Sequence, residues 1–142
     1  MNQQQIVLKN DLAEIETMTA VIEQFGEAQA LPLRVIFDMN LVLEEIITNI
    51  ISYGYDDELE HSIMIELSWD NGLLALTVTD DAKPFDPLAN AAPDLLLPLE
   101  EREAGGLGIF FVKEKMDEVT YKWEQGHNIL AMKKKYAPEL QN

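Results

Sequence analysis

Apolar residues recur at three- and four-residue intervals over residues 12–25, which predicts an amphipathic helix that ends near Gly26. The preceding residues 3–9 form a short run that is typical of a strand. Asn10 or Asp11 stands at the junction, where either side chain can cap the helix. The chain is therefore expected to open with a strand and a packing helix.

A second predicted helix is longer and more apolar. It begins at Pro32 and ends at Tyr53, just before Gly54. Its length and its apolar residues identify it as a core element. Glu45 and Asn49 interrupt this apolar pattern four residues apart, so both project from one face of the helix, one turn from each other. Polar side chains in such a helix are candidates for function.

Alternation of apolar and polar residues predicts four further strands. These runs occupy residues 63–69, 73–79, 119–124 and 129–133. Turn-forming residues at 70–72 separate the first two runs, and residues 125–128 separate the last two. The chain is therefore expected to contain two β-hairpins, and Asp80 follows directly after the first of them.

Glycine is concentrated before a last, short helix. Gly105, Gly106 and Gly108 lead into an apolar segment of helical spacing that closes at Asp117. Glycine lets a backbone approach an anion closely, and the N–H groups of a helix's first turn point toward that anion. The arrangement suits phosphate binding, although a glycine-rich turn before an ordinary amphipathic helix has the same pattern.

Composition narrows the classes of function. The chain has 142 residues, enough for one domain over residues 1–142 but not for a second full domain. It has no cysteine and two histidines, which excludes disulfides, thiolate catalysis and cysteine–zinc sites and disfavours a histidine-built metal site. A net charge of −16 opposes binding to nucleic acid or to an anionic membrane. No signal peptide or membrane span is recognised, so a soluble cytoplasmic protein is expected.

A proline-rich connection separates the first hairpin from the glycines. Residues 82–104 carry prolines at positions 84, 87, 93 and 98 among small and acidic residues. A connection of this length is either a functional lid or a disordered linker. Both of its ends adjoin candidate ligand-binding segments, which favours a lid.

The order of these features resembles the GHKL superfamily of ATPases and kinases, which includes gyrase, the histidine kinases and MutL-like proteins. The features are a helix with Glu-x-x-x-Asn, a strand ending in Asp, a long lid, Gly-Gly-x-Gly before a helix, and a final hairpin. Within the superfamily the chain is most similar to the small anti-sigma-factor serine/threonine kinases of bacteria. The resemblance covers roughly residues 31–135.

The resemblance implies roles for the polar pair of the second helix. The segment EEIITNIISYGY, residues 44–55, is similar to the N box of the superfamily. There the asparagine binds the magnesium ion that bridges the nucleotide phosphates, and this role falls on Asn49. The glutamate four residues earlier acts as general base on the attacking hydroxyl, and this role falls on Glu45. A capping or surface glutamate is the alternative interpretation of Glu45.

The segment DDAKPFDP resembles the G1 box, Asp-x-Gly-x-x-Phe. Asp80 matches the aspartate that accepts a hydrogen bond from the adenine amino group, and Phe85 matches the phenylalanine. Ala82 occupies the position of the glycine. If that position requires a positive φ or a close approach of the backbone to adenine, alanine strains the turn and weakens nucleotide binding.

The G2 box, Gly-Gly-x-Gly, is matched by Gly105, Gly106, Leu107 and Gly108. In the superfamily this loop supplies backbone donors for the phosphates. Lys113 lies about a turn into the following helix and Arg102 lies just before the loop, so either could reach the phosphates when the lid is closed. A solvent-facing helical lysine is an equally good interpretation of Lys113.

The resemblance implies a two-layer α/β sandwich, with a mixed and mostly antiparallel sheet covered on one face by helices. It implies ATP and Mg²⁺ as cofactors, bound between the helical layer and the lid. The implied activity is that of a protein serine/threonine kinase. Such a kinase sequesters a sigma factor and phosphorylates a serine or threonine of an anti-anti-sigma (STAS-type) partner.

Other functions stay open at this stage. Ala82 and the acidity favour a non-catalytic, ATP-sensing or ATP-free partner-binding module of the same fold, whereas Glu45, Asn49 and the glycines favour the enzyme. A detached ATPase domain for histidine phosphotransfer would need a dimerisation helix with an accessible histidine, but His61 opens a predicted strand and His127 lies in a predicted turn. A homodimer through the N-terminal strand and helix is a further hypothesis, although that helix packs equally well on its own domain.

Overall fold

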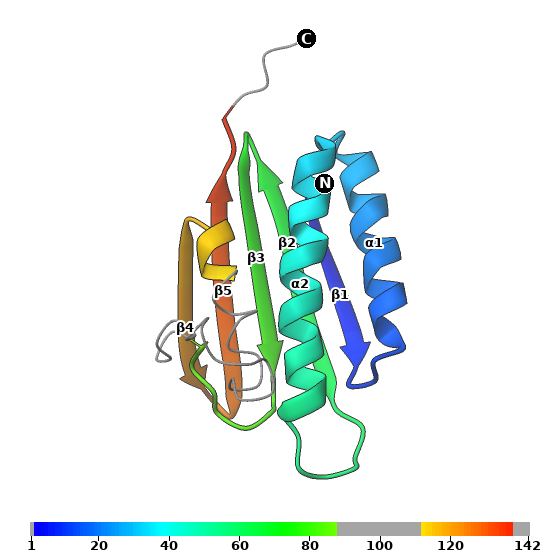
Figure 1. Cartoon of the computed structure of the whole chain (residues 1–142), viewed down its shortest axis with the longest axis vertical. Coiled ribbons are helices and arrows are strands. Elements are labelled where there is room, and N and C mark those ends of the chain that lie inside the picture. Colours follow the sequence, from blue (N-terminus) through cyan, green and yellow to red (C-terminus); the bar gives the residue numbers. More distant parts are fainter. Residues whose placement is uncertain (1, 88–111, 138–142) are drawn as a thin grey trace, which may run out of the picture.

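The computed structural model describes residues 2–87 and 112–137, which form one sheet and two long helices (Figure 1). The strands are β1 (Gln3–Lys9), β2 (Ser62–Asp70), β3 (Leu73–Asp80), β4 (Glu118–Glu124) and β5 (His127–Lys135), and the helices are α1 (Glu14–Ala28) and α2 (Leu33–Tyr53). A further helical turn spans residues 112–115. The strands and helices predicted for these regions are present, with bounds shifted by one or two residues.

The sheet has the strand order β1-β2-β3-β5-β4, and every neighbouring pair is antiparallel. Both predicted hairpins are present. Each has a two-residue turn, at 71–72 and at 125–126, with positive φ at both residues, which matches the right-handed twist of paired strands. The predicted turn at 125–128 is wrong by two residues, because His127 and Asn128 already pair with β4.

Both helices cover the same face of the sheet (Figure 1). The strands alternate accordingly, and in β3 Leu74, Leu76 and Val78 are buried while the residues between them are partly exposed. The fully buried stripe of α2 consists of Val35, Met39, Leu43 and Ile47. Burying one large aliphatic side chain contributes about 1.5–3 kcal/mol, so the packing of α2 on the sheet is a major source of stability. This arrangement confirms the predicted two-layer α/β sandwich, while the sheet of the described residues is wholly antiparallel rather than mixed.

The start of α1 differs from the prediction. Neither Asn10 nor Asp11 is its N-cap, which is Ala13 without a side-chain cap. Asn10 Oδ1 instead accepts a hydrogen bond from His61 N at 2.9 Å, which fastens the end of β1 to the start of β2. Asp11 Oδ1 accepts from Ala13 N in the turn before the helix. Both side chains therefore form hydrogen bonds before the helix begins, and neither accepts from the first turn of α1.

The end of α1 also differs, because the helix continues through Gly26 to Ala28. A Cβ on Gly26 would lie 2.4 Å from Ile36 Cδ1 of α2. Gly26 therefore lies where α1 packs closely against the Ile36 side chain of α2, and it does not end the first helix. In the part of the chain that the structure describes, neither helix is long and apolar enough to cross a membrane.

Candidate functional site

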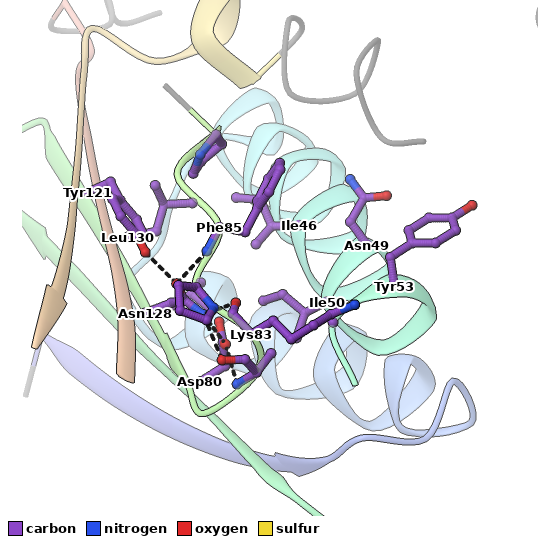
Figure 2. Close-up of a pocket in the computed structure, with 15 residues that line it drawn as sticks. Ile46, Asn49, Ile50, Tyr53, Asp80, Lys83, Phe85, Tyr121, Asn128 and Leu130 are labelled. Atoms are coloured by element: carbon purple, nitrogen blue, oxygen red, sulfur yellow. Dashed lines mark hydrogen bonds between the residues drawn. The ribbon is translucent and has the colours of Figure 1, made fainter. Parts of the chain in front are cut away.

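A pocket opens between the C-terminal half of α2 and the adjoining ends of β3 and β5 (Figure 2). It encloses about 400 Å³, within the range of small-molecule sites. Its apolar lining includes Ile46, Ile50, Val78, Pro84, Phe85, Pro87 and Leu130, and its polar lining includes Asn49, Tyr53, Asp80, Lys83, Tyr121 and Asn128. An apolar slot with a few polar groups suits a flat, partly polar ligand such as a nucleobase.

Asp80 ends β3 in this pocket and is 4% exposed. Its Oδ1 accepts hydrogen bonds from Asn128 Nδ2 and from the backbone N of Ala82, both at 2.9 Å. Among the described residues no hydrogen bond reaches Oδ2, so that oxygen is available as an acceptor. Burial raises the pKa of Asp80, and the two hydrogen bonds oppose that rise. The carboxylate matched to the G1 box therefore belongs to a ligand-sized pocket.

Asn128 was assigned to a turn from the sequence, yet it is 6% exposed in β5, opposite Asp80 of β3. Its Nδ2 donates to Asp80 Oδ1 at 2.9 Å, Ala82 O at 3.3 Å and Lys83 O at 2.9 Å, while its Oδ1 accepts from Tyr121 Oη at 2.5 Å and Phe85 N at 3.1 Å (Figure 2). The sequence carried one signal, since Asn128 shares the alternation of the buried residues Leu130 and Met132.

Ala82 does not strain its turn, so the condition of a positive φ at the G1-box glycine position is not met, and the effect of alanine on nucleotide binding stays a prediction. In the described regions the non-glycine residues with positive φ are Ala30, Asn71 and Gln125, so the backbone at Ala82 suits an L-residue. Its methyl group lies against Gly54, where an added Cβ would be 2.8 Å from Ala82 Cβ. Glycine at the end of α2 therefore makes room for alanine in the G1 box.

The segment after Asp80 is fastened to the loop that follows α2. Lys83 N donates to Gly54 O at 3.0 Å, and Lys83 Nζ lies 3.0 Å from Asp56 Oδ1. Phe85 lines the pocket with 52% of its surface exposed, while its backbone N is held by Asn128. The Phe85 ring is therefore placed on a fixed backbone and presents an open face to a ligand.

Glu45 and Asn49 lie one turn apart on α2, and Asn49 Nδ2 donates to Glu45 Oε2 at 3.1 Å. Asn49 lines the pocket, whereas Glu45 is partly buried beside it and does not. Because Nδ2 is bonded to Glu45, Asn49 Oδ1 is the atom left to accept. One amide oxygen fits Mg²⁺, which takes one or two protein oxygens and completes its shell with phosphates and water. These residues therefore fit the implied magnesium site.

Four residues beside the pocket form a cluster that we call the His61 clasp: Tyr55, Asp57, His61 and Asp81. His61 Nδ1 lies 3.1 Å from Asp81 Oδ2, and Nε2 lies 2.9 Å from Asp57 Oδ1. Tyr55 Oη donates to Asp81 Oδ1 at 3.1 Å, and its ring stacks on His61. Hydrogen bonds to Asp81 and Asp57 raise the pKa of His61, and the bond from His61 lowers the pKa of Asp57. The clasp ties the loop after α2 to the strand end that carries Asp80.

The helical turn at residues 112–115 carries Lys113, which is partly buried. This turn is anchored on α2, because Lys115 Nζ lies 3.1 Å from Asp38 Oδ1. Tyr136 Oη donates to Asp38 Oδ2 at 2.7 Å and so completes the anchor. Lys113 does not line the pocket in the described regions.

The remaining predicted site residues, Arg102, Gly105, Gly106, Leu107 and Gly108, lie outside the described residues, as do positions 88–104 of the predicted lid. Their contacts with phosphate stay a prediction. The described part of the site therefore brings together Asn49, Asp80, Ala82 and Phe85 and adds Asn128.

Comparison with known proteins agrees with this geometry. The sequence profile of the histidine kinase-like ATPase domain matches residues 8–134. The serine/threonine-protein kinase BtrW of Bordetella bronchiseptica is 26% identical over 106 residues, which cover 75% of either chain. The serine-protein kinase RsbW of Halalkalibacterium halodurans is 31% identical over 101 residues, covering 68% of this chain and 60% of that protein. The anti-sigma F factor of Bacillus subtilis is 25% identical over 83 residues, covering 58% of this chain and 57% of that protein.

A solved structure has the same fold. The crystal structure of RsbU and RsbW domains from Mycobacterium tuberculosis superposes with a TM-score of 0.64 at 14% identity, covering 95% of this chain and 32% of that one. At that identity the likeness concerns the fold alone. The profile match, by contrast, runs from the end of β1 nearly to the end of β5. The chain therefore belongs to the histidine kinase-like ATPase domain family.

Proposed function

We propose that this protein is an ATP-dependent protein serine/threonine kinase of the anti-sigma type, formed by a single domain over residues 1–142. One observation carries the proposal: a single pocket is lined by Asp80 from the sheet and by Asn49 from α2 (Figure 2). The names of relatives, which include protein kinases and anti-sigma F factors, support it.

The end of the pocket that is lined by Asp80 and Asn128, which we call the base-binding end, accounts for adenine recognition. Asp80 Oδ2 accepts a hydrogen bond from the exocyclic amino group of the base. The apolar side chains of Ile50 and Leu130 enclose the rings, and the open face of Phe85 packs on them. A carboxylate acceptor in an apolar slot repels a base that presents an oxygen at the same position.

The end of the pocket beside Asn49 and Glu45 of α2, which we call the helix end, accounts for phosphoryl transfer. Asn49 Oδ1 would hold Mg²⁺, which supplies charge neutralisation on the β- and γ-phosphates when bound. Glu45 accepts the proton of the attacking serine or threonine hydroxyl as the γ-phosphoryl group passes from ATP to that oxygen and ADP leaves. Asn49 Nδ2 orients the Glu45 carboxylate for this transfer. Lys113, Arg102 and the glycine loop at 105–108 bind the phosphates.

The protein substrate is an anti-anti-sigma protein of the STAS type, and the second partner is a sigma factor that the protein sequesters. The net charge of −16 suits a partner with a basic surface. We place the protein in the cytoplasm, where it acts as a homodimer joined through β1 and α1. Phosphorylation of the substrate then decides which partner is bound.

Titration calorimetry with ATP and MgCl₂ tests the nucleotide site. We expect Asn49→Ala to weaken magnesium-dependent binding by about 10-fold, the loss of one charge-assisted contact. Asn40→Ala, on the same helix but outside the pocket lining, serves as the matched control and should bind as wild type does. Absence of ATP binding in the wild type would contradict the proposal and favour an ATP-free partner-binding module.

Phosphoryl transfer is tested separately. The protein is incubated with ATP, MgCl₂ and purified STAS-type proteins, and phosphoserine or phosphothreonine is located by mass spectrometry. A phosphorylated site supports the kinase. ATP binding without transfer to any of these proteins would instead favour the non-catalytic, ATP-sensing module.

A further inference from the structure

The side chain of Asn128 joins the segments that form the base-binding end of the pocket. Among the described residues, its amide nitrogen donates to Asp80 Oδ1 and to the carbonyl oxygens of Ala82 and Lys83. Its amide oxygen faces only donors, namely Tyr121 Oη and Phe85 N. These partners fix the orientation of the amide, because reversing it would set its hydrogens against the N–H of Phe85 and its oxygen against three acceptor oxygens.

The amide has two consequences for Asp80. First, it satisfies Oδ1, and a buried carboxylate requires such donors to stay in its acceptor form. Second, with Oδ1 engaged by Asn128 and by Ala82 N, the carboxylate cannot rotate freely, and Oδ2 is the oxygen left for a ligand. The same amide accepts a hydrogen bond from Phe85 N and so fixes the backbone of a residue that lines the pocket.

We propose that Asn128 is a positioning residue for base selectivity: through Asp80 it makes the pocket accept a purine with an amino group at position 6 and reject one with an oxygen there. The inference rests on the proposed function, since it assigns the base-binding end of the same nucleotide site. Asn128 does not touch the reacting phosphates in this scheme. Its effect on ligand binding is confined to the identity of the base and to the pH range in which that base is bound.

The substitution Asn128→Asp tests this because it keeps the size of the side chain, removes the donor and adds a titratable carboxyl group. Two carboxylates then meet at Asp80 Oδ1, and such a pair holds one shared proton at low pH and loses it at high pH. The shared proton restores the missing donor. ATP affinity of the variant should therefore be near that of wild type at low pH and should fall by about 10- to 100-fold as the pH rises.

A control variant must leave unchanged the titratable and charged groups around residue 128. The titratable or charged groups near it are Asp80 and Asp81 at the end of β3, Tyr121 on β4, His127 on β5, Tyr55 in the loop after α2, and Lys83 and Asp86 in the segment after β3. Asn71→Asp makes the same chemical change in the exposed β2–β3 turn, at the far end of β3. It leaves all of these groups in place and should give the pH profile of wild type.

The experiment is calorimetry of the full chain with ATP and with inosine triphosphate, each with MgCl₂, from pH 5.5 to pH 9. Wild type should prefer ATP by about 10-fold or more across this range. Asn128→Asp should lose ATP affinity with rising pH, whereas wild type and Asn71→Asp should not. Equal pH profiles in Asn128→Asp and wild type would overturn the inference while leaving the proposed function intact. Failure of wild type to bind ATP would count against the proposed function itself.

A second variant keeps the inference testable if Asn128→Asp does not fold. Asn128→Ser removes the amide without adding a charge, and we expect its preference for ATP over inosine triphosphate to fall at least about 5-fold. Thermal melting at each pH shows that the protein under assay is folded. An unchanged preference in folded Asn128→Ser would contradict the role of Asn128.

Discussion

The two ends of the pocket are held in different ways. At the base-binding end, Asp80 and Asn128 are 4% and 6% exposed, and their hydrogen bonds join β3, β5, β4 and the segment after β3. At the helix end, Glu45 and Asn49 are partly exposed and are bonded to each other within α2. The first is a buried network of distant segments, and the second is a pair supplied by one helix.

This difference separates recognition from chemistry. A buried network whose partners are already satisfied is formed during folding, so the base meets a rigid acceptor and little ordering is needed on binding. A partly exposed pair on one helix can turn its side chains when phosphates and metal arrive. Substitutions in the network should therefore change folding and base binding together, whereas substitutions in the pair should change the reaction with little effect on folding.

Glu45→Gln should produce the largest effect. The variant keeps an oxygen to accept from Asn49 Nδ2 but cannot take up a proton. We expect kcat for phosphoryl transfer to fall by about 10²- to 10⁴-fold, while the Kd for ATP changes by less than about 2-fold. Transfer to the protein substrate and calorimetry measure the two quantities.

Glu44→Gln is the matched control, because Glu44 is the neighbouring glutamate on α2 and is exposed. It should leave both quantities unchanged. Equal losses of kcat in the two variants would show that Glu45 has no special role in the reaction, and the alternative of a surface glutamate would then hold.

Asp80→Asn should come next and should act at the other end of the pocket. The amide needs one oxygen for Asn128 Nδ2 and then presents hydrogens to the amino group of the base. We expect ATP affinity to fall by about 10- to 100-fold, or about 1–3 kcal/mol. Asp70→Asn, at the turn end of the same hairpin, should bind ATP as wild type does. Wild-type affinity in Asp80→Asn would show that the base lies elsewhere.

How far the sequence predicts each end follows from the same difference. The proximity of Glu45 and Asn49 was predicted because the 3.6-residue period of one helix fixes their relative position. The helices and strands were predicted for the same reason, since their periodicity is local. The position of Asn128 beside Asp80 was not predicted, because it depends on a partner 48 residues away and on a strand pairing that no local pattern specifies.

The absence of a strained turn at Ala82 could not be predicted for a similar reason. The G1-box pattern suggested that a glycine is needed for backbone geometry at that position. The structure shows instead that the space between Ala82 and Gly54 limits what can stand at position 82. Gly54 leaves enough space for the Ala82 methyl group, because it has no Cβ of its own. A contact between residues 54 and 82 is visible only after the chain has folded.

Gly54→Ala therefore tests packing beneath the base-binding end. The new Cβ would lie 2.6 Å from Ile50 O and 2.8 Å from Ala82 Cβ, so we expect the free energy of unfolding to fall by about 1–3 kcal/mol. Ala82→Gly alone should cost about 1 kcal/mol or less. In the double variant part of the first loss should be recovered, and urea denaturation of all four proteins measures the coupling. Strictly additive losses would argue against contact between the two positions.

His61→Gln should have the smallest effect, and it should depend on pH. The raised pKa of His61 means that its contribution to stability is complete below about pH 6.5, the unfolded value, and is lost as the pH rises through the folded value. The lowered pKa of Asp57 and of Asp81 means that their contribution is present above about pH 4 and is lost in acid.

The His61 clasp is therefore strongest between about pH 4 and pH 6.5. The Tm of His61→Gln should fall below that of wild type in this window, and the difference should shrink toward pH 9, as measured by thermal melting at constant ionic strength. A constant difference between His61→Gln and wild type would mean that the ring acts by stacking on Tyr55 rather than by its charge.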